Sequence, residues 1–209
     1  MLNVNKIRLD FPLLRTYNEA YLDNAATAQR PQCVLDAICN FYSNSNANPL
    51  RGFYPLSLAA PDAYESARAR VAQFIGAKSA SEVVFTRNAS ESLNLVAYTY
   101  GLAKLKPGDR VVVSILEHHS NMLPWQMVCK KTGAELHYLE CQMDGSFTEE
   151  ALDAAITPNT KIVAVTHVSN VMGCVSPVEE IVERAHQAGA VVVLDGAQSV
   201  PHMPVNVTK

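Results

Sequence analysis

Short apolar runs alternate with stretches of helical periodicity over most of the chain. The runs that predict strands cover residues 83–86, 110–115, 136–139, 161–166 and 191–194. Apolar side chains at helical spacing predict helices over residues 31–43, 61–75, 90–105, 124–132, 149–156 and 177–188. Residues 111–113 and 191–193 are apolar at every position, which is typical of strands covered by helices on both faces. The alternation therefore predicts an α/β fold with an open, mostly parallel sheet and right-handed connections.

Signals for helix ends accompany these periodic stretches. Gly76 and Gly133 follow two of the predicted helices, where glycine commonly ends a helix. Ser176 and Glu179 have the spacing of a capping box, and Pro177 suits the first position of a helix. We therefore expect the helix over 177–188 to begin with a reciprocal side-chain cap.

Length, net charge and the length of the apolar runs restrict the kinds of molecule that the chain can bind. The chain has 209 residues, 48% of them hydrophobic, which suits one globular domain and part of a second. Its 17 basic and 20 acidic residues give a net charge of −3, without the basic surface that binds nucleic acid or an anionic membrane. The apolar runs are shorter than the roughly 20 residues that span a bilayer, and the first residues do not resemble a signal peptide. We expect no nucleic acid, no membrane and a cytoplasmic location.

Four segments rich in polar side chains directly follow predicted strands. They are residues 87–91, 117–121, 167–170 and 195–198. In open α/β sheets, ligands bind outside the carboxyl ends of the strands. The sequence therefore predicts one site that gathers these four segments.

Two of the segments carry groups that suit a charged ligand, one for an anion and the other for a positive charge. Asn88, Ala89 and Ser90 open a helix, whose free amides attract an anion such as phosphate, although plain N-capping explains them equally well. Asp195 ends an apolar strand, so its charge requires a partner: a protonated heterocycle nitrogen, a lysine, a metal or a local turn.

The other candidates are a histidine and two amides. His118 could stack on a planar ligand or move a proton near neutral pH, or be an ordinary loop histidine. Asn170 and Gln198 could donate to a ligand oxygen or bond to local backbone.

A metal site and a thiol nucleophile compete with this interpretation. His118, His119, His167 and Asp195 can all bind zinc or iron, but their spacing matches no metal motif, so we expect no metal. The five cysteines are odd in number and form no Cys-x-x-Cys pair, so we expect free, buried structural thiols without a nucleophilic role.

Several short sequence motifs, in their order along the chain, resemble those of the class V aminotransferase family. They resemble most the SufS/CsdA-like cysteine desulfurases, which use pyridoxal 5'-phosphate (PLP) on the large domain of fold type I. The matching words are residues 21–27 (YLDNAAT), 85–87 (FTR) with 90–91 (SE), 117–125 (EHHSNMLPW), 166–173 (THVSNVMG) and 195–198 (DGAQ).

The resemblance implies a role for each candidate residue. Asp195 would pair with the pyridine nitrogen, Gln198 would bond to the ring hydroxyl oxygen, and His118 would stack on the ring and assist proton transfers. The phosphate would lie on Ala89 and Ser90. Asn170 would reach the ring oxygen and the substrate carboxylate, and Ala26 and Arg51 would also contact substrate.

The implied reaction converts L-cysteine to L-alanine and leaves persulfide sulfur on the enzyme for iron–sulfur cluster assembly. A homodimer and a sulfur acceptor of SufE/SufU type are the implied partners. A selenocysteine lyase, or a non-catalytic remnant that binds a ligand or a partner, remains as an alternative.

Three departures from the family pattern affect these expectations. Asn88, Ala89 and Ser90 replace a Gly-Thr-Thr word, and Leu50 replaces a histidine before Arg51. The chain also ends before the family's Schiff-base lysine and catalytic cysteine loop. We therefore expect an N-terminal arm over 1–27 and an incomplete large domain over 28–209, inactive alone.

Overall fold

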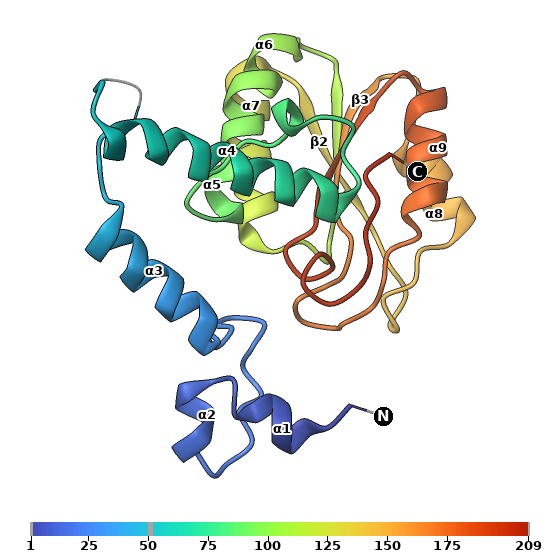
Figure 1. The fold of residues 1–209 in the computed structure, drawn as a ribbon. Helices are drawn as coiled ribbons and strands as arrows, with labels where there is room; N and C mark the ends of the chain where they lie inside the picture. The colour runs from blue at the N-terminus through green and yellow to red at the C-terminus, as the bar shows by residue number, and fades with distance from the viewer. Residues whose placement is uncertain (1, 50–51, 209) are drawn as a thin grey trace. The chain divides into compact units, whose positions relative to one another are not determined.

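A computed structural model describes residues 2–49 and 52–208, which form two compact units. The first unit comprises the chain up to Val83, and the second comprises residues 84–207. Figure 1 shows the described helices of the first unit joined by turns and loops, whereas the second unit contains a sheet between helices.

The first unit is helical. Its elements are α1 (Val4–Arg8), α2 (Pro12–Thr16), α3 (Gln32–Asn44), α4 (Pro55–Ile75) and the short 3₁₀ turn η1 (Ala80–Glu82). The helix predicted to start at Pro61 begins six residues earlier, because Pro55 occupies the first turn, where its missing N–H costs nothing. Gly76 ends α4 with a φ of 72°, as predicted.

The second unit contains a parallel sheet of four strands. These are β1 (Arg110–Ser114), β2 (Glu135–Leu139), β3 (Thr160–Thr166) and β4 (Val191–Asp195), and they lie in the order β2-β1-β3-β4. The helical elements are α5 (Ala89–Val96), the π-helical turn η2 (Ala97–Gly101), α6 (Leu102–Lys104), η3 (His119–Asn121), α7 (Leu123–Thr132), α8 (Glu149–Ala155) and α9 (Val178–Gln187). The predicted α/β class is confirmed.

Alternate residues of the central strands pack into two separate cores. Val111 and Val113 of β1 contact the cluster around Trp125 and Val128 of α7, whereas Val112 contacts the cluster formed with α8 and α9. Figure 1 shows α5 and α7 on one face of the strands and α8 and α9 on the other. The strands are therefore buried on both faces, as their uninterrupted apolar runs predict.

Two local predictions are wrong. Residues 83–86 form no strand in the described part of the chain, where they have no strand beside them, and Val84 is 67% exposed. A strand needs a hydrogen-bonding neighbour as well as a suitable sequence. The capping box at α9 does not form, since the Ser176 hydroxyl donates to the Thr166 carbonyl oxygen at 2.7 Å instead. Pro177 becomes the N-cap residue of α9.

The predicted helix over residues 90–105 is one continuous run with a π-helical turn in its middle. Gly101 ends that turn, and a β-carbon at this position would lie 3.1 Å from the ring of Trp125 and 3.2 Å from Val128. The glycine therefore allows this helix to approach α7 closely. None of the described helices combines the length and apolarity required to cross a bilayer.

Candidate cofactor site at the carboxyl edge of the sheet

The strand order places a topological switch point between β1 and β3. From this pair the chain proceeds outward in opposite directions, to β2 on one side and to β4 on the other. Ligands of open α/β sheets bind in the crevice outside such a point, at the carboxyl ends of the strands. The segments after β1 and β3 carry His118 and Asn170, so both predicted residues begin at this edge.

His118 lies in the exposed turn between β1 and α7. Its Nδ1 atom accepts the Ser120 amide hydrogen at 3.1 Å and lies 2.7 Å from the Ser120 hydroxyl. Because Nδ1 is an acceptor in the amide bond, the neutral ring carries its proton on Nε2. The local backbone therefore sets the tautomer of this histidine, and Nε2 is its donor.

A pocket of about 370 Å³ joins this turn to the start of α5. Its lining residues are Ser90, Asn94, Tyr98, His118, His119, Ser120, Leu123, Pro124 and Met127. The structure therefore brings together two residues predicted from separate segments, Ser90 and His118.

The N-terminus of α5 is capped and still has open amides. The Asn88 side chain accepts from the Glu91 amide at 2.9 Å, so the N-capping interpretation is confirmed for Asn88. No carbonyl of the helix can accept from Ala89 and Ser90, because they occupy its first positions. Hydrogen bonds from the Arg87 side chain at 3.1 Å and from its amide at 2.6 Å hold the pKa of Glu91 below its usual range, and the guanidinium balances the charge of that carboxylate.

Asp195 is a buried acid at the end of β4, only 6% exposed. Its Oδ1 atom accepts the Ala197 amide hydrogen at 2.9 Å, so the local-turn role is also present. Its backbone oxygen accepts from the His167 amide at 2.9 Å. The Nδ1 atom of His167 is buried and has no hydrogen-bond partner among the described residues.

These observations test whether PLP fits the residues present. The start of α5 offers amides for an anion, Asp195 offers a buried negative charge for a protonated ring nitrogen, and His167 has an unsatisfied buried nitrogen. A phosphate and a protonated pyridine are the groups that this donor set complements. The residues of the second unit therefore fit PLP.

Asn170 and Gln198 lie in the turns after β3 and β4. Asn170 is exposed at the tip of a hairpin closed by a bridge between Val168 and Val175. Gln198 is half-buried, and its backbone oxygen is 2.6 Å from Nδ1 of His202. Both residues belong to the predicted edge, and their contacts with a ligand remain predictions.

The two substrate residues predicted from the first unit are not tested by the site geometry. Ala26 lies in an exposed turn closed by a hydrogen bond from the Thr27 amide to the Asp23 oxygen. Arg51 and the preceding Leu50 lie outside the described residues. Their roles toward substrate remain predictions.

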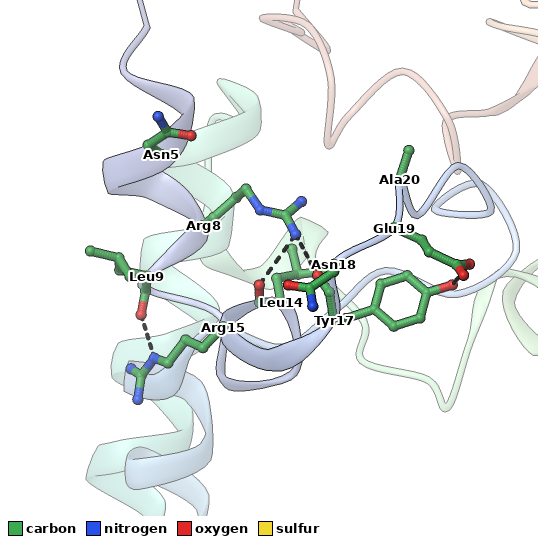
Figure 2. Close-up of a pocket in the computed structure, with 9 residues that line it drawn as sticks. All are labelled: Asn5, Arg8, Leu9, Leu14, Arg15, Tyr17, Asn18, Glu19 and Ala20. Carbon is green, nitrogen blue, oxygen red and sulfur yellow. Dashed lines mark hydrogen bonds between the residues drawn. The ribbon is translucent and has the colours of Figure 1, made fainter.

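A separate pocket of about 490 Å³ lies in the first unit and contains two arginines (Figure 2). Its guanidinium groups already have backbone partners: Arg8 donates to the oxygens of Leu14 and Tyr17, and Arg15 donates to that of Leu9. The arginines thus stabilise the fold of the N-terminal segment. Of the predicted site residues that the structure describes, none lines this pocket.

Glu117 belongs to a predicted site segment, but its sequence position alone suggested no role for it. It is 8% exposed and accepts hydrogen bonds from Asn121 at 2.6 Å and from the Thr166 amide at 2.8 Å. Burial raises its pKa to about 7, with the Asp195 charge contributing. The signal in the sequence was an acid soon after an apolar strand, as for Asp195.

The cysteines differ from the expectation that all five are buried. Cys33 and Cys39 are exposed on α3, none of whose described residues is buried, whereas Cys129 lies in the core beside Val128. Among the described residues, no group of three or more histidine, cysteine or acidic side chains could hold a metal ion.

Thiol labelling should separate these cysteines. Burial raises the pKa of Cys129 to about 11, so its thiolate is scarce at pH 8 as well as inaccessible. We expect Cys33 and Cys39 to react with iodoacetamide at least about 100 times faster than Cys129, measured by peptide mass spectrometry. Equal rates in the folded chain would contradict the burial of Cys129.

Known proteins with similar sequences belong to a family of the kind that this site indicates. The family described as Aminotransferase class-V matches residues 20–209. A Synechocystis protein named "Probable cysteine desulfurase" is 49% identical over 205 residues, covering 96% of this chain and 49% of the relative. A Haloferax volcanii protein named "Cysteine desulfurase" is 46% identical, covering 98% of this chain and 52% of the relative.

Solved structures give the same result. The apo cysteine desulfurase of Thermococcus onnurineus NA1 superimposes with a TM-score of 0.92 at 42% identity, covering all of this chain and 51% of that one. The Escherichia coli cysteine desulfurase CsdA gives a TM-score of 0.87 at 38% identity, covering 100% of this chain and 52% of that one. The chain belongs to the class V aminotransferase family, and it spans about half the length of the curated relatives it matches.

Proposed function

We propose that this chain forms the cofactor-binding part of a PLP-dependent cysteine desulfurase, which converts L-cysteine to L-alanine and transfers the sulfur to an enzyme thiol. The relatives named cysteine desulfurase support the reaction. A relative at 29% identity is described as SspA in complex with cysteine, which supports the substrate. The observation that carries the proposal is the buried carboxylate of Asp195 at the same sheet edge as His118 and Ser90.

Each residue of the second unit has a task in this proposal. When bound, PLP supplies an electron sink for the bonds around the substrate α-carbon. Asp195 holds a proton on the ring nitrogen, His118 covers the ring and moves a proton at Nε2, and the amides of Ala89 and Ser90 hold the phosphate. Asn170 and Gln198 donate to oxygen atoms of the cofactor or substrate.

The proposed location, oligomeric state and sulfur acceptor follow from the SufS-like motifs of the sequence. We place the protein in the cytoplasm, as a homodimer that supplies sulfur for iron–sulfur clusters through an acceptor of SufE/SufU type. In the first unit, Ala26 and Arg51 would contact the substrate.

The proposal is tested by the products that the whole PLP-loaded protein, of which this chain is the proposed cofactor-binding part, forms from L-cysteine. We expect alanine and, after reduction, sulfide in equal amounts. Alanine formation from selenocysteine alone would instead indicate a selenocysteine lyase, and no alanine from either substrate would contradict the proposal.

The phosphate position can be tested on this chain without turnover. Ser90→Asp puts a carboxylate at the N-terminus of α5, where it competes with an anion for the open amides. We expect it to weaken PLP binding about tenfold or more, measured by equilibrium dialysis. The control Ser43→Asp adds the same charge at an exposed position of α3 and should leave binding unchanged. Equal binding by the two variants would contradict the phosphate position.

A further inference from the structure

The turn that carries His118 is closed by two buried side chains that flank it in the sequence. Glu117 is 8% exposed and Asn121 is fully buried, whereas His118 and His119 between them are exposed. The Asn121 Nδ2 atom donates to Glu117 Oε2 at 2.6 Å, and the Asn121 amide donates to the His118 oxygen at 2.8 Å. We call this pair the Glu117–Asn121 clasp.

The clasp is anchored to three other elements. Glu117 Oε1 accepts from the hydroxyl of Ser114, the last residue of β1, and from the amide of Thr166, the last residue of β3. Asn121 Oδ1 accepts from Trp125 Nε1 of α7 at 3.2 Å. The clasp therefore lies at the switch point and joins both central strands to the helix after the turn.

Burying the Glu117 carboxylate in this turn carries a desolvation cost. Desolvation opposes the ionised form of Glu117 more strongly than its three hydrogen bonds favour it, and the Asp195 charge acts in the same direction. Further titratable groups at this edge include His118 and His119 in the same turn, His167 after β3, and Arg87 and Glu91 at the start of α5. Buried acids with such environments gather at functional sites.

We infer that Glu117 is a positioning residue, whose clasp with Asn121 holds the turn that presents His118 to the pocket. The fixed tautomer of His118 depends on the Ser120 amide, and this amide lies inside the clasped turn. Without the clasp, the turn keeps only its local backbone bonds. The catalytic consequence rests on the proposed function, whereas the effect on the turn does not.

Swapping the carboxyl group of Glu117 and the amide group of Asn121 between the two positions tests the clasp. In Glu117→Gln, the oxygen still accepts from Ser114 and Thr166, but its NH₂ group then faces the NH₂ group of Asn121. Rotating Asn121 only moves this donor–donor contact to Trp125. The double variant Glu117→Gln with Asn121→Asp restores every hydrogen bond, because the carboxylate introduced at position 121 accepts both from the NH₂ group introduced at position 117 and from Trp125.

Hydrogen exchange of this chain gives the readout. The reporters are the amides of Asn121 and Met122, which donate to the His118 and His119 oxygens. We expect Glu117→Gln to accelerate their exchange about tenfold or more, and the double variant to return it to within about threefold of wild type. Amides of α9, which lies against the opposite face of the sheet, should exchange at wild-type rates in all variants.

Two results of the exchange experiment would contradict the inference. Unchanged exchange at Asn121 and Met122 in Glu117→Gln, or equal acceleration in α9, would show that the clasp does not hold the turn. If Glu117→Gln fails to fold, the double variant decides: wild-type exchange supports the clasp, and a second failure to fold contradicts it.

A kinetic measurement distinguishes this inference from the proposed function. In the protein that releases alanine from cysteine, Glu117→Gln should lower kcat about tenfold while KM for cysteine changes less than about threefold, and the double variant should recover kcat. Absence of alanine in the wild-type protein would contradict the proposed function only. Normal kcat in Glu117→Gln alongside accelerated exchange would contradict the link to His118.

Discussion

In the whole PLP-loaded enzyme that contains this chain, replacing Asp195 by alanine should reduce alanine formation from cysteine by about 100- to 1,000-fold. The carboxylate is buried at the end of β4, and its negative charge favours a proton on a ring nitrogen placed against it. Alanine has no charge, so the ring would lose its proton and much of its capacity as an electron sink. The measurement is the initial rate of alanine release at saturating cofactor.

Two further variants identify the cause of that loss. Asp195→Asn keeps an oxygen that can accept from the Ala197 amide but removes the charge, so it should be nearly as impaired as alanine. Asp153→Ala removes an exposed acid that pairs with Arg184 at 3.0 Å, and it should leave the rate unchanged because surface ion pairs contribute little. A fully active Asp195→Asn variant would show that the charge is not required.

The stability of the chain should fall as the pH rises from about 4.5 to about 7, because Glu117 is protonated more readily in the folded state than in the unfolded state. Its ordinary pKa is 4.5, and burial raises it to about 7 in the fold. Within this window the unfolded chain has lost the proton and the folded chain still binds it, so ionisation favours unfolding. The contribution of this one group is roughly 3 kcal/mol.

Glu117→Gln supplies the control for that titration. Other acids and the histidines also titrate between pH 4.5 and 7, but they are common to both chains and cancel in the difference. We expect the free energy of unfolding of the wild type, relative to the variant, to drop by roughly 3 kcal/mol between pH 4.5 and pH 8. Trp125 is the single tryptophan and contacts the clasp, so its fluorescence can follow urea unfolding. Parallel pH profiles would contradict the raised pKa.

The buried strands were predictable because their signal is local. The runs at residues 110–115, 136–139, 161–166 and 191–194 match the observed strands to within about one residue at each end. Residues 83–86 have the same composition, yet no strand lies beside them in the described residues. The choice between a strand and an extended segment depends on a neighbour elsewhere in the fold.

The candidate site was predictable in part for the same reason. The rule that ligands bind at the carboxyl edge brought Ser90 and His118 together, and the pocket that they line confirms this juxtaposition. The importance of Glu117 was hidden, because one of its partners, the Thr166 amide, lies 49 residues further along the chain. Its environment exists only once β1 and β3 are adjacent.

The close approach at Gly101 has a consequence for which substitutions this fold tolerates. A methyl group at Gly101 would press on the Trp125 ring, the same side chain whose indole N–H holds Asn121. Asn121 in turn holds Glu117. Steric pressure at Gly101 would thus be passed through three neighbouring side chains to the turn of His118. Gly101 therefore constrains the turn of His118 as well as the core, although it does not line the pocket that Ser90 and His118 share.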